Sequence, residues 1–359
     1  METVNKNIKL NTVVINVFLT IVFITLFLLG DYGIAGDSNS YITMGLTREP
    51  GYSILLWVMR SLFGEENYFI PLALFQNAFA CISVIWVAHY FGKRLFNSGL
   101  GYWVCALILS MPYLLTPIFS RTHLVMANKI MAEGITVPLY YFFMLYIVKM
   151  IFEEDKFGKN AAIAWGISLL LVLTRGQLIL SSIIWLLTVV VRLLLEKTYI
   201  KIYVPVLSVV LLLVCNALVT RTYHGINSGV FAATASSKPM ILANVLYVSE
   251  PKDGDHIQDP KLRELFERVY RELDKQGMLY RYAEGNIIDK ALHHEDCHDT
   301  ISFDYFEPVK NDIYYHSEHH EILMADGYPA YLIKQDEIAA ALTGELLKNN
   351  WPNYLKNYV

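Results

Sequence analysis

The chain has 359 residues, of which 55% are hydrophobic and only 17% are charged, and its mean hydropathy is +0.37. Its formal net charge of −4 excludes the strongly basic surface that nucleic-acid binding requires. This composition is typical of a protein that crosses a membrane several times.

Seven apolar runs follow one another through the first 220 residues. A helix needs roughly 20 apolar residues to cross a bilayer, so each run predicts a transmembrane helix, although the fifth is short. The first run has no small-residue cleavage site, and we expect it to be retained. The runs occupy residues 12–30, 68–91, 99–119, 134–152, 161–174, 177–195 and 202–220.

The acidic residues are concentrated in the last part of the chain, where 22 of the 33 follow residue 221. We therefore predict a transmembrane module at 1–221, with a first external loop at 31–66, and a soluble domain of mixed character at 222–359. Cys297 is the only cysteine of that domain, which excludes a disulfide within it.

Lysine and arginine predict the orientation of the spans. With the N-terminus in the cytoplasm, ten of these residues lie in cytoplasmic segments of the module and five lie on the opposite side. Because cytoplasmic loops carry the excess of positive charge, we expect a cytoplasmic N-terminus. Seven crossings then place the loop 31–66 and the C-terminal domain outside the cytoplasm.

The first external loop contains two predicted helices. The polar stretch 31–41 leads into a helix over Ser38–Leu46, with Ser38 as the candidate N-cap. Tyr52–Phe63 is apolar and aromatic but too short to span, which favours a helix lying in the membrane interface. The alternative is a partly buried loop helix without contact to lipid.

Four short motifs occur in this module in a fixed order. Together they resemble the GT-C superfamily of membrane glycosyltransferases, in the branch of protein O-mannosyltransferases and lipid A aminoarabinose transferases. The chain departs from the family pattern at Ser53, Ala132 and Gly176. The motifs are Gly36-Asp37-Ser38-Asn39-Ser40-Tyr41, Arg48-Glu49-Pro50-Gly51-Tyr52, Met131-Ala132-Glu133-Gly134 and Thr174-Arg175.

The resemblance implies a polytopic α-helical membrane protein with a GT-C-like module. Such enzymes pass a sugar from a polyprenyl-phosphate donor to a lipid, glycan or protein acceptor on the external face of the plasma (bacterial inner) membrane. In that scheme Asp37 is the general base, since it occupies the family's acidic position. The alternative role of Asp37 is to cap the helix that follows it.

The resemblance also implies a set of substrate-binding residues. Arg175 is expected to grip the donor phosphate, although an arginine at a helix end also extends to the membrane surface. Glu133 is expected to pair with Arg121 or Lys129, to help hold a metal, or to anchor the helix at the interface.

Four further residues complete this set. Arg48 is expected to orient Asp37 or to touch the sugar phosphate, and Tyr52 belongs to the same motif. Arg221 and His224 end the seventh span and are expected to meet the donor phosphate, although a basic and aromatic membrane boundary explains them equally well.

The C-terminal domain contains two predicted helices, Pro260–Lys275 and Asp336–Leu347, and a cluster of histidines. His294 and His298 stand at i and i+4, the spacing of a metal-binding pair on one helix face, so a Zn site is one interpretation. A solvated loop or an acceptor-binding surface is the other. An oxygen-rich Mg or Mn site at Asp37 is equally plausible. The rest of the cluster is His316, Glu318, His319, His320 and Glu321.

Two other classes of protein fit parts of this pattern. A transporter or flippase of lipid-linked sugars would favour inverted repeats and charged, interrupted helices, and no such repeat is visible. A membrane scaffold leaves the one-sided gathering of Asp37, Glu133 and Arg175 unexplained. Members of the family usually carry further spans, and Trp351–Val359 resembles the approach to an eighth.

Overall fold

The computed structural model describes residues 2–34, 36–96, 99–119, 123–315 and 327–356. These residues form helices and connecting segments, and no named strand occurs among them. The chain divides into two compact units, Met1–Phe231 and Ala232–Val359, which we call the N-terminal and C-terminal units. The division follows residue 231 rather than the predicted 221, because the last helix of the first unit continues to Ser228.

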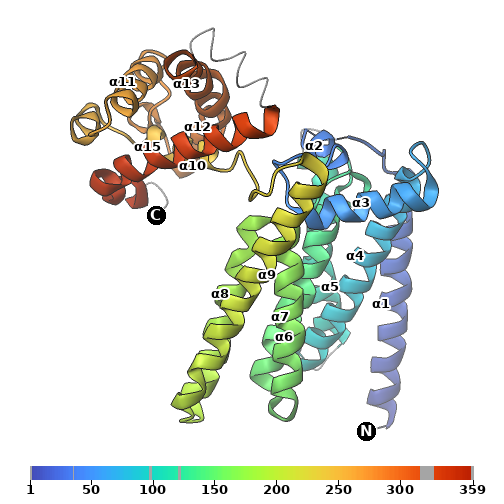
Figure 1. Ribbon diagram of the computed structural model, residues 1–359. Coiled ribbons are helices and arrows are strands. Elements are labelled where there is room, and N and C mark those ends of the chain that lie inside the picture. Colours follow the sequence, from blue (N-terminus) through green and yellow to red (C-terminus); the bar gives the residue numbers. More distant parts are fainter. Residues whose placement is uncertain (1, 35, 97–98, 120–122, 316–326, 357–359) are drawn as a thin grey trace. The chain divides into compact units, whose positions relative to one another are not determined.

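Seven helices in the described part of the chain are long and apolar enough to cross a membrane, which confirms the seven predicted segments (Figure 1). The N-terminal unit is therefore that of a polytopic helical membrane protein. The helices are α1 (Glu2–Leu29), α4 (Phe69–Phe91), α5 (Gly99–Phe119), α6 (Glu133–Phe152), α7 (Phe157–Thr174), α8 (Leu180–Leu195) and α9 (Tyr203–Ser228).

The spans differ in how much of each is covered by the others. Half of the α4 span is buried inside the bundle, whereas only 11% of the α9 span is buried. The outward faces carry large apolar side chains that water would solvate poorly, and a lipid bilayer provides a compatible environment for them. Examples are Ile21, Leu107, Leu187 and Leu211.

Clusters of buried side chains hold the spans together. One joins α1, α4 and α5 through Ile15, Val84 and Tyr113. Another joins α6, α7 and α8 through Phe143 and Trp185. A third cluster, which includes Leu56 and Leu72, packs α3 (Pro50–Phe63) against α4 at the end of the bundle where the candidate site lies.

Two helices lie in the loop between α1 and α4. The first, α2 (Ser38–Ile42), is shorter than the predicted Ser38–Leu46. Met44 adopts a left-handed backbone with φ 55°, which a continuing helix cannot contain. The second, α3 (Pro50–Phe63), begins at a proline whose fixed φ suits the first helical position.

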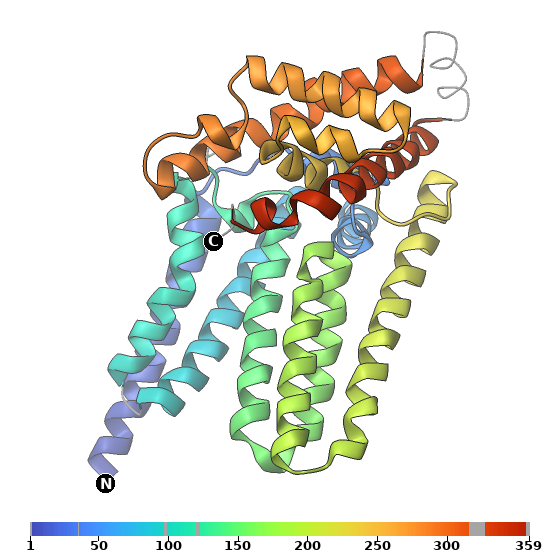
Figure 2. The same ribbon diagram turned by 90° about the vertical axis from the view of Figure 1, so that its left-hand side faces the viewer.

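Helix α3 lies across the end of the bundle instead of along it, at the end away from the N-terminus (Figures 1 and 2). Its inner face buries Leu56 and Met59, while Trp57 and Leu62 on the outer face are exposed. The exposed face is thus largely apolar, so the predicted interfacial helix is compatible with a bilayer surface.

Helices are the only regular elements among the described residues of the C-terminal unit, where the sequence predicted a domain of mixed character. In this unit α10 packs along α15. A π-helical segment at 301–306 joins α12 to α13, so the chain is helical without a break from 287 to 314. The helices are α10 (Lys238–Tyr247), α11 (Pro260–Lys275), α12 (Ile287–Thr300), α13 (Glu307–Tyr314) and α15 (Tyr328–Lys356).

Both predicted helices of this unit are present. Helix α11 has the predicted bounds, and the Asp259 carboxylate accepts from the amides of Lys261 and Leu262 at its start. Leu265, Phe266 and the other apolar residues of one face are buried in the core of the unit. The segment Asp336–Leu347 is the middle of the longer α15.

Candidate functional site

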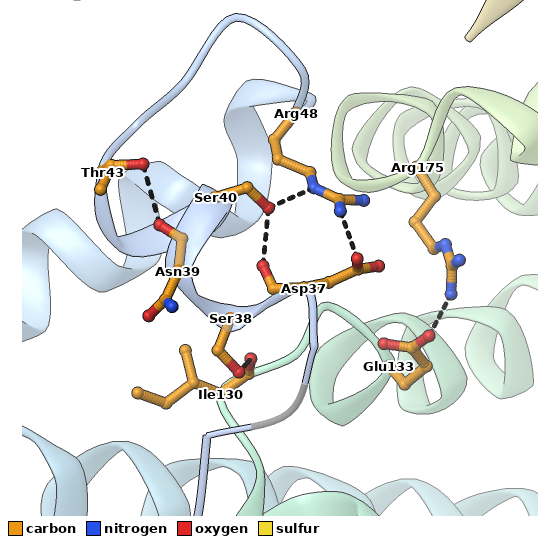
Figure 3. A network of polar contacts seen from close by, with 9 residues as sticks. All are labelled: Asp37, Ser38, Asn39, Ser40, Thr43, Arg48, Ile130, Glu133 and Arg175. Atoms are coloured by element: carbon orange, nitrogen blue, oxygen red, sulfur yellow. Dashed lines mark hydrogen bonds and ion pairs between the residues drawn. The ribbon is translucent and has the colours of Figure 1, made fainter. Parts of the chain in front are cut away.

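The loop that carries Asp37 is tied to the segment preceding α6. The Gly33 amide donates to the Asn128 carbonyl, and the Ile130 amide donates to the Gly33 carbonyl, each at 3.3 Å. The Ser38 hydroxyl donates to the Ile130 carbonyl at 2.7 Å (Figure 3). These bonds fix the backbone on both sides of Asp37.

Asn128 anchors the end of α1 to the same segment. Its side-chain amide donates to the carbonyls of Leu26 at 3.0 Å and Gly30 at 3.1 Å. Its Oδ1 accepts from Asn77 of α4 at 2.7 Å. The last carbonyls of a helix lack partners within it, so this buried amide satisfies them and fixes where the loop starts.

Gln76 of α4 links the same segment to α3. Its Nε2 donates to the carbonyls of Ala127 at 2.9 Å and Lys129 at 3.0 Å, and its Oε1 accepts from the Tyr52 hydroxyl at 2.9 Å. Tyr52 is fully buried, which raises the pKa of its hydroxyl well above the ordinary value. Its ring meets that of Tyr41 edge to face, so Tyr52 supports the site from behind.

Asp37 forms an ion pair with Arg48. Arg48 Nη2 lies 2.5 Å from Asp37 Oδ1, and Arg48 Nε donates to the Ser40 hydroxyl at 2.6 Å (Figure 3). That hydroxyl donates in turn to the Asp37 carbonyl at 2.6 Å. Asp37 stands at the N-cap position of α2, but its side chain makes no capping hydrogen bond. The carboxylate therefore faces Arg48 and not the helix start.

Helix α9 holds the turn that carries Arg48. His224 Nε2 lies 3.1 Å from the Arg48 carbonyl, and since a carbonyl only accepts, Nε2 carries the hydrogen. Thr220 donates to Glu49 Oε2 at 3.2 Å. The Arg48 guanidinium lies 4.9 Å above the Tyr41 ring. His224 is fully buried and thus positions Arg48 through its backbone.

Arg221 has a different neighbourhood from His224. Its Nη1 donates to the Ala217 carbonyl of its own helix at 3.4 Å. The described contacts do not bring this side chain to the ion pair of Asp37.

Glu133 and Arg175 form a second ion pair, between Glu133 Oε1 and Arg175 Nη1 (Figure 3). Each side chain is a little over one quarter exposed. The second carboxylate oxygen, Oε2, is buried and accepts no hydrogen bond from any described residue. The predicted partners of Glu133 were Arg121 and Lys129. Arg121 lies outside the described residues. The charge of Glu133 does act on Lys129, where it opposes the lowering of the lysine pKa by burial.

Two glycines allow the two ion pairs to approach each other. A side chain at Gly51, in the first turn of α3, would come within 2.8 Å of the Leu173 carbonyl near the end of α7. A side chain at Gly176 would come within 3.0 Å of Glu49 Oε1. The contact at Gly51 is with backbone and is shorter than real Cβ atoms show, so glycine is the residue that fits there, whereas the flexible Glu49 side chain can shift away from a Cβ at position 176.

Tyr41 lies within the electrostatic influence of both ion pairs. Burial raises the pKa of its hydroxyl, and the charges of Arg48 and Arg175 lower it while those of Glu133 and Asp37 raise it. All four charged groups therefore act on one phenol. Sequence reasoning did not single out this residue, although it ends the Gly36–Tyr41 motif.

The four charges of this site sum to zero. Each arginine can bind a phosphate or carboxylate through its planar fork, but it must then share or leave its present carboxylate. Each carboxylate can accept a proton once its arginine turns away. The arrangement thus provides two anion-binding groups and two proton acceptors around one tyrosine.

No group of three or more His, Cys, Asp or Glu side chains able to hold a metal occurs in the described ranges. Two carboxylates, Asp37 and Glu133, supply the oxygen ligands that Mg²⁺ and Mn²⁺ prefer, and the unbonded Glu133 Oε2 is chemically suited to such an ion. A divalent cation at this site stays a prediction.

The histidine pair of the C-terminal unit bonds within the protein. His294 Nε2 lies 2.8 Å from Asn244 Oδ1, and His298 Nε2 lies 3.1 Å from the Met240 carbonyl. Burial lowers the pKa of His294, and the neighbouring histidines lower it further. These contacts attach α12 to α10. The other members of the cluster, His316, Glu318, His319, His320 and Glu321, lie outside the described residues.

Comparisons with protein-family models, with curated proteins and with solved structures find no match to this chain.

Proposed function

We propose that this protein is an integral-membrane glycosyltransferase that uses a polyprenyl-phosphate-linked sugar. The proposal is supported by the approach of two acid–arginine pairs, Asp37–Arg48 and Glu133–Arg175, to Tyr41 at one end of the helical bundle. The acceptor is a lipid, glycan or protein, and the reaction face is extracytoplasmic.

The proposed reaction exchanges one bond at the anomeric carbon of the sugar. The bond from this carbon to the donor phosphate breaks, and its electron pair leaves with the phosphate oxygen. A bond from the same carbon to the acceptor oxygen or nitrogen forms, and Asp37 takes the acceptor proton. Arg175, with Arg48 beside it, stabilises the negative charge of the leaving phosphate.

The first prediction concerns the base. Asp37→Asn keeps the shape of the side chain but removes the proton acceptor, so we expect sugar transfer to fall at least about 100-fold. The measurement is label transfer in membranes supplied with polyprenyl-phosphate mannose, glucose or aminoarabinose. Transfer at the parental rate would exclude Asp37 as the base.

The matched control lies in the same loop. The exposed Glu65 forms an ion pair of 2.6 Å with the part-buried Arg60, and Glu65→Gln should change transfer by less than about twofold. Repeating the assay in EDTA and with added Mg²⁺ or Mn²⁺ tests whether a divalent ion contributes positive charge besides the arginines.

A further inference from the structure

A groove in the C-terminal unit is independent of the charged site described above. It has a volume of about 430 Å³, which lies in the range of small-molecule binding sites. Residues from the end of α10, the turn at 280–282 and the last part of α15 line it.

One side of the groove is aromatic and rigid. Tyr247 and Leu279 line this side and are almost fully buried in the protein. Tyr280 is 38% exposed, and its ring meets that of Tyr247 edge to face. His293 Nε2 lies 3.2 Å from the Gly277 carbonyl and must donate to it, so His293 Nδ1 accepts from the Tyr247 hydroxyl at 2.8 Å. This bond fixes the Tyr247 ring before any ligand arrives.

The other side of the groove is polar. Glu250, Arg281 and Asn353 line it, and the Asn353 amide donates to Glu250 Oε1 at 3.4 Å. A carboxylate accepts hydrogen bonds, a guanidinium donates them, and an amide does both. The groove therefore offers hydrogen-bond donors and hydrogen-bond acceptors opposite an aromatic surface.

The charges along the polar side are already compensated. Arg281 forms an ion pair with Asp274, and Glu250 Oε2 lies 2.6 Å from Lys252 Nζ. A ligand that carried a net charge would meet no unopposed charge on the polar side of the groove, while on the aromatic side the Lys290 ammonium lies 5.4 Å from the centre of the Tyr280 ring. An uncharged ligand with many hydrogen-bonding groups fits them better.

We propose that this groove binds an uncharged saccharide. A sugar ring has an apolar face, which packs on Tyr280, and hydroxyls at its edge, which donate to Glu250 and exchange hydrogen bonds with Asn353. This binding needs no sugar transfer, so the inference does not depend on the proposed function.

The test measures binding of uncharged oligosaccharides of glucose, mannose, galactose and N-acetylglucosamine to the full-length protein in lipid nanodiscs. Saturation-transfer NMR at millimolar ligand detects weak complexes. Tyr280→Ala should weaken binding about tenfold, which corresponds to the loss of one aromatic contact. Tyr328→Ala, an exposed tyrosine that does not line the groove, should leave binding unchanged.

Asn353→Ala removes one amide at the rim without truncating a core residue, and it should also weaken binding. Circular dichroism of each variant verifies that its helices are intact. The inference is overturned if no uncharged oligosaccharide of the panel binds, or if both groove variants bind as the parent does. Tighter binding of uronic-acid or phosphorylated sugars than of their uncharged counterparts would equally overturn it.

Discussion

At the scale of single residues, the two arginines of the candidate site hold carboxylates that a donor phosphate would have to displace. Arg175 pairs with Glu133 and Arg48 pairs with Asp37. The planar fork of arginine grips a phosphate with two hydrogen bonds, which the single ammonium of lysine cannot reproduce.

Arg175→Lys therefore keeps the positive charge but removes the planar guanidinium that can bind a phosphate through two hydrogen bonds. We expect the KM for the polyprenyl-phosphate donor to rise about tenfold, which is about 1.4 kcal/mol, with a smaller change in kcat. The control is Arg192→Lys, at an arginine of α8 that pairs with Glu196 just beyond the end of this helix and belongs to no part of the site. An unchanged KM in Arg175→Lys would remove Arg175 from the donor site.

Lys310 is a buried lysine whose ionisation should make the stability of the C-terminal unit depend on pH. It is fully buried in the C-terminal unit, where its Nζ donates to the Tyr331 hydroxyl at 3.0 Å and lies 4.3 Å from the centre of the Tyr331 ring. Burial lowers the pKa of its ammonium from 10.5 to about 8. The folded chain thus releases this proton above pH 8, while the unfolded chain holds it up to pH 10.5.

Stability should therefore rise with pH through this window. At pH 9.5 the gain over pH 7 is about 2 kcal/mol, since one pKa unit corresponds to about 1.4 kcal/mol. Burial raises the pKa of Tyr315 to about 12, so ionisation of unfolded tyrosine opposes the gain above pH 10. Amide hydrogen exchange of α13, corrected for the chemical exchange rate, measures the change.

Lys310→Met should abolish this rise, because methionine has similar length and no charge. Lys334→Met removes an exposed lysine of α15 that pairs with Glu337, and it should leave the rise intact. If the stability of Lys310→Met rose with pH as much as that of the parent protein, the pH dependence would come from groups other than Lys310.

At the scale of elements, the contact of α3 with the end of α7 brings the two ion pairs together. Gly51→Ala places a methyl group 2.8 Å from the Leu173 carbonyl, so one of the two helices must move. We expect a loss of about 1–3 kcal/mol, measured as a lower Tm in detergent, and slower sugar transfer because Arg48 precedes this turn.

Gly166→Ala is the matched control in α7, since its added Cβ would meet nothing within 4 Å. It should stabilise the helix slightly, by up to about 1 kcal/mol. A parental Tm in Gly51→Ala would mean that α3 and α7 adapt freely to each other.

The elements were largely predictable from the sequence, while their contacts were not. Hydropathy alone located the seven spans, because lipid-facing helices must be apolar along their length. The Glu133–Arg175 pair joins residues on different helices, and no local pattern indicates such a contact. The sequence also did not predict the anchoring roles of Asn128 and Gln76, because a single polar residue near an apolar run belongs to no recognisable motif.

The short motifs predicted positions better than roles. The contact between Asp37 and Arg48 follows from their neighbourhood in one loop. Tyr52 shares the motif of Arg48 but is buried behind Tyr41, because the inner face of α3 must pack on α4. His294 and His298 do lie at i and i+4 on one helix, as predicted. Their Nε2 atoms, however, make hydrogen bonds with residues of α10.

At the scale of the whole molecule, orientation is the property that the proposed function needs most. The loop 31–66 and the C-terminal unit should both be extracytoplasmic if the bias of lysine and arginine sets the topology. Exposed side chains suited to labelling are Glu65 in the loop, Lys252 in the C-terminal unit and Glu196 between α8 and α9.

In a background without the natural cysteines, Glu65→Cys and Lys252→Cys should react with a membrane-impermeant maleimide on intact cells. Glu196→Cys should react only after the cells are permeabilised. Labelling of Glu196→Cys on intact cells, or protection of Glu65→Cys, would reverse the predicted orientation.

The end of α9 has a mechanical consequence. This helix bonds the Arg48 turn through Thr220 and His224, and the chain of the C-terminal unit starts a few residues later. The last turns of α9 are therefore both the end of the seventh span and a brace for the arginine loop. A tilt of α9 within the bundle displaces the Arg48 backbone, so the spacing of the charged pairs changes although neither pair contains a residue of this helix.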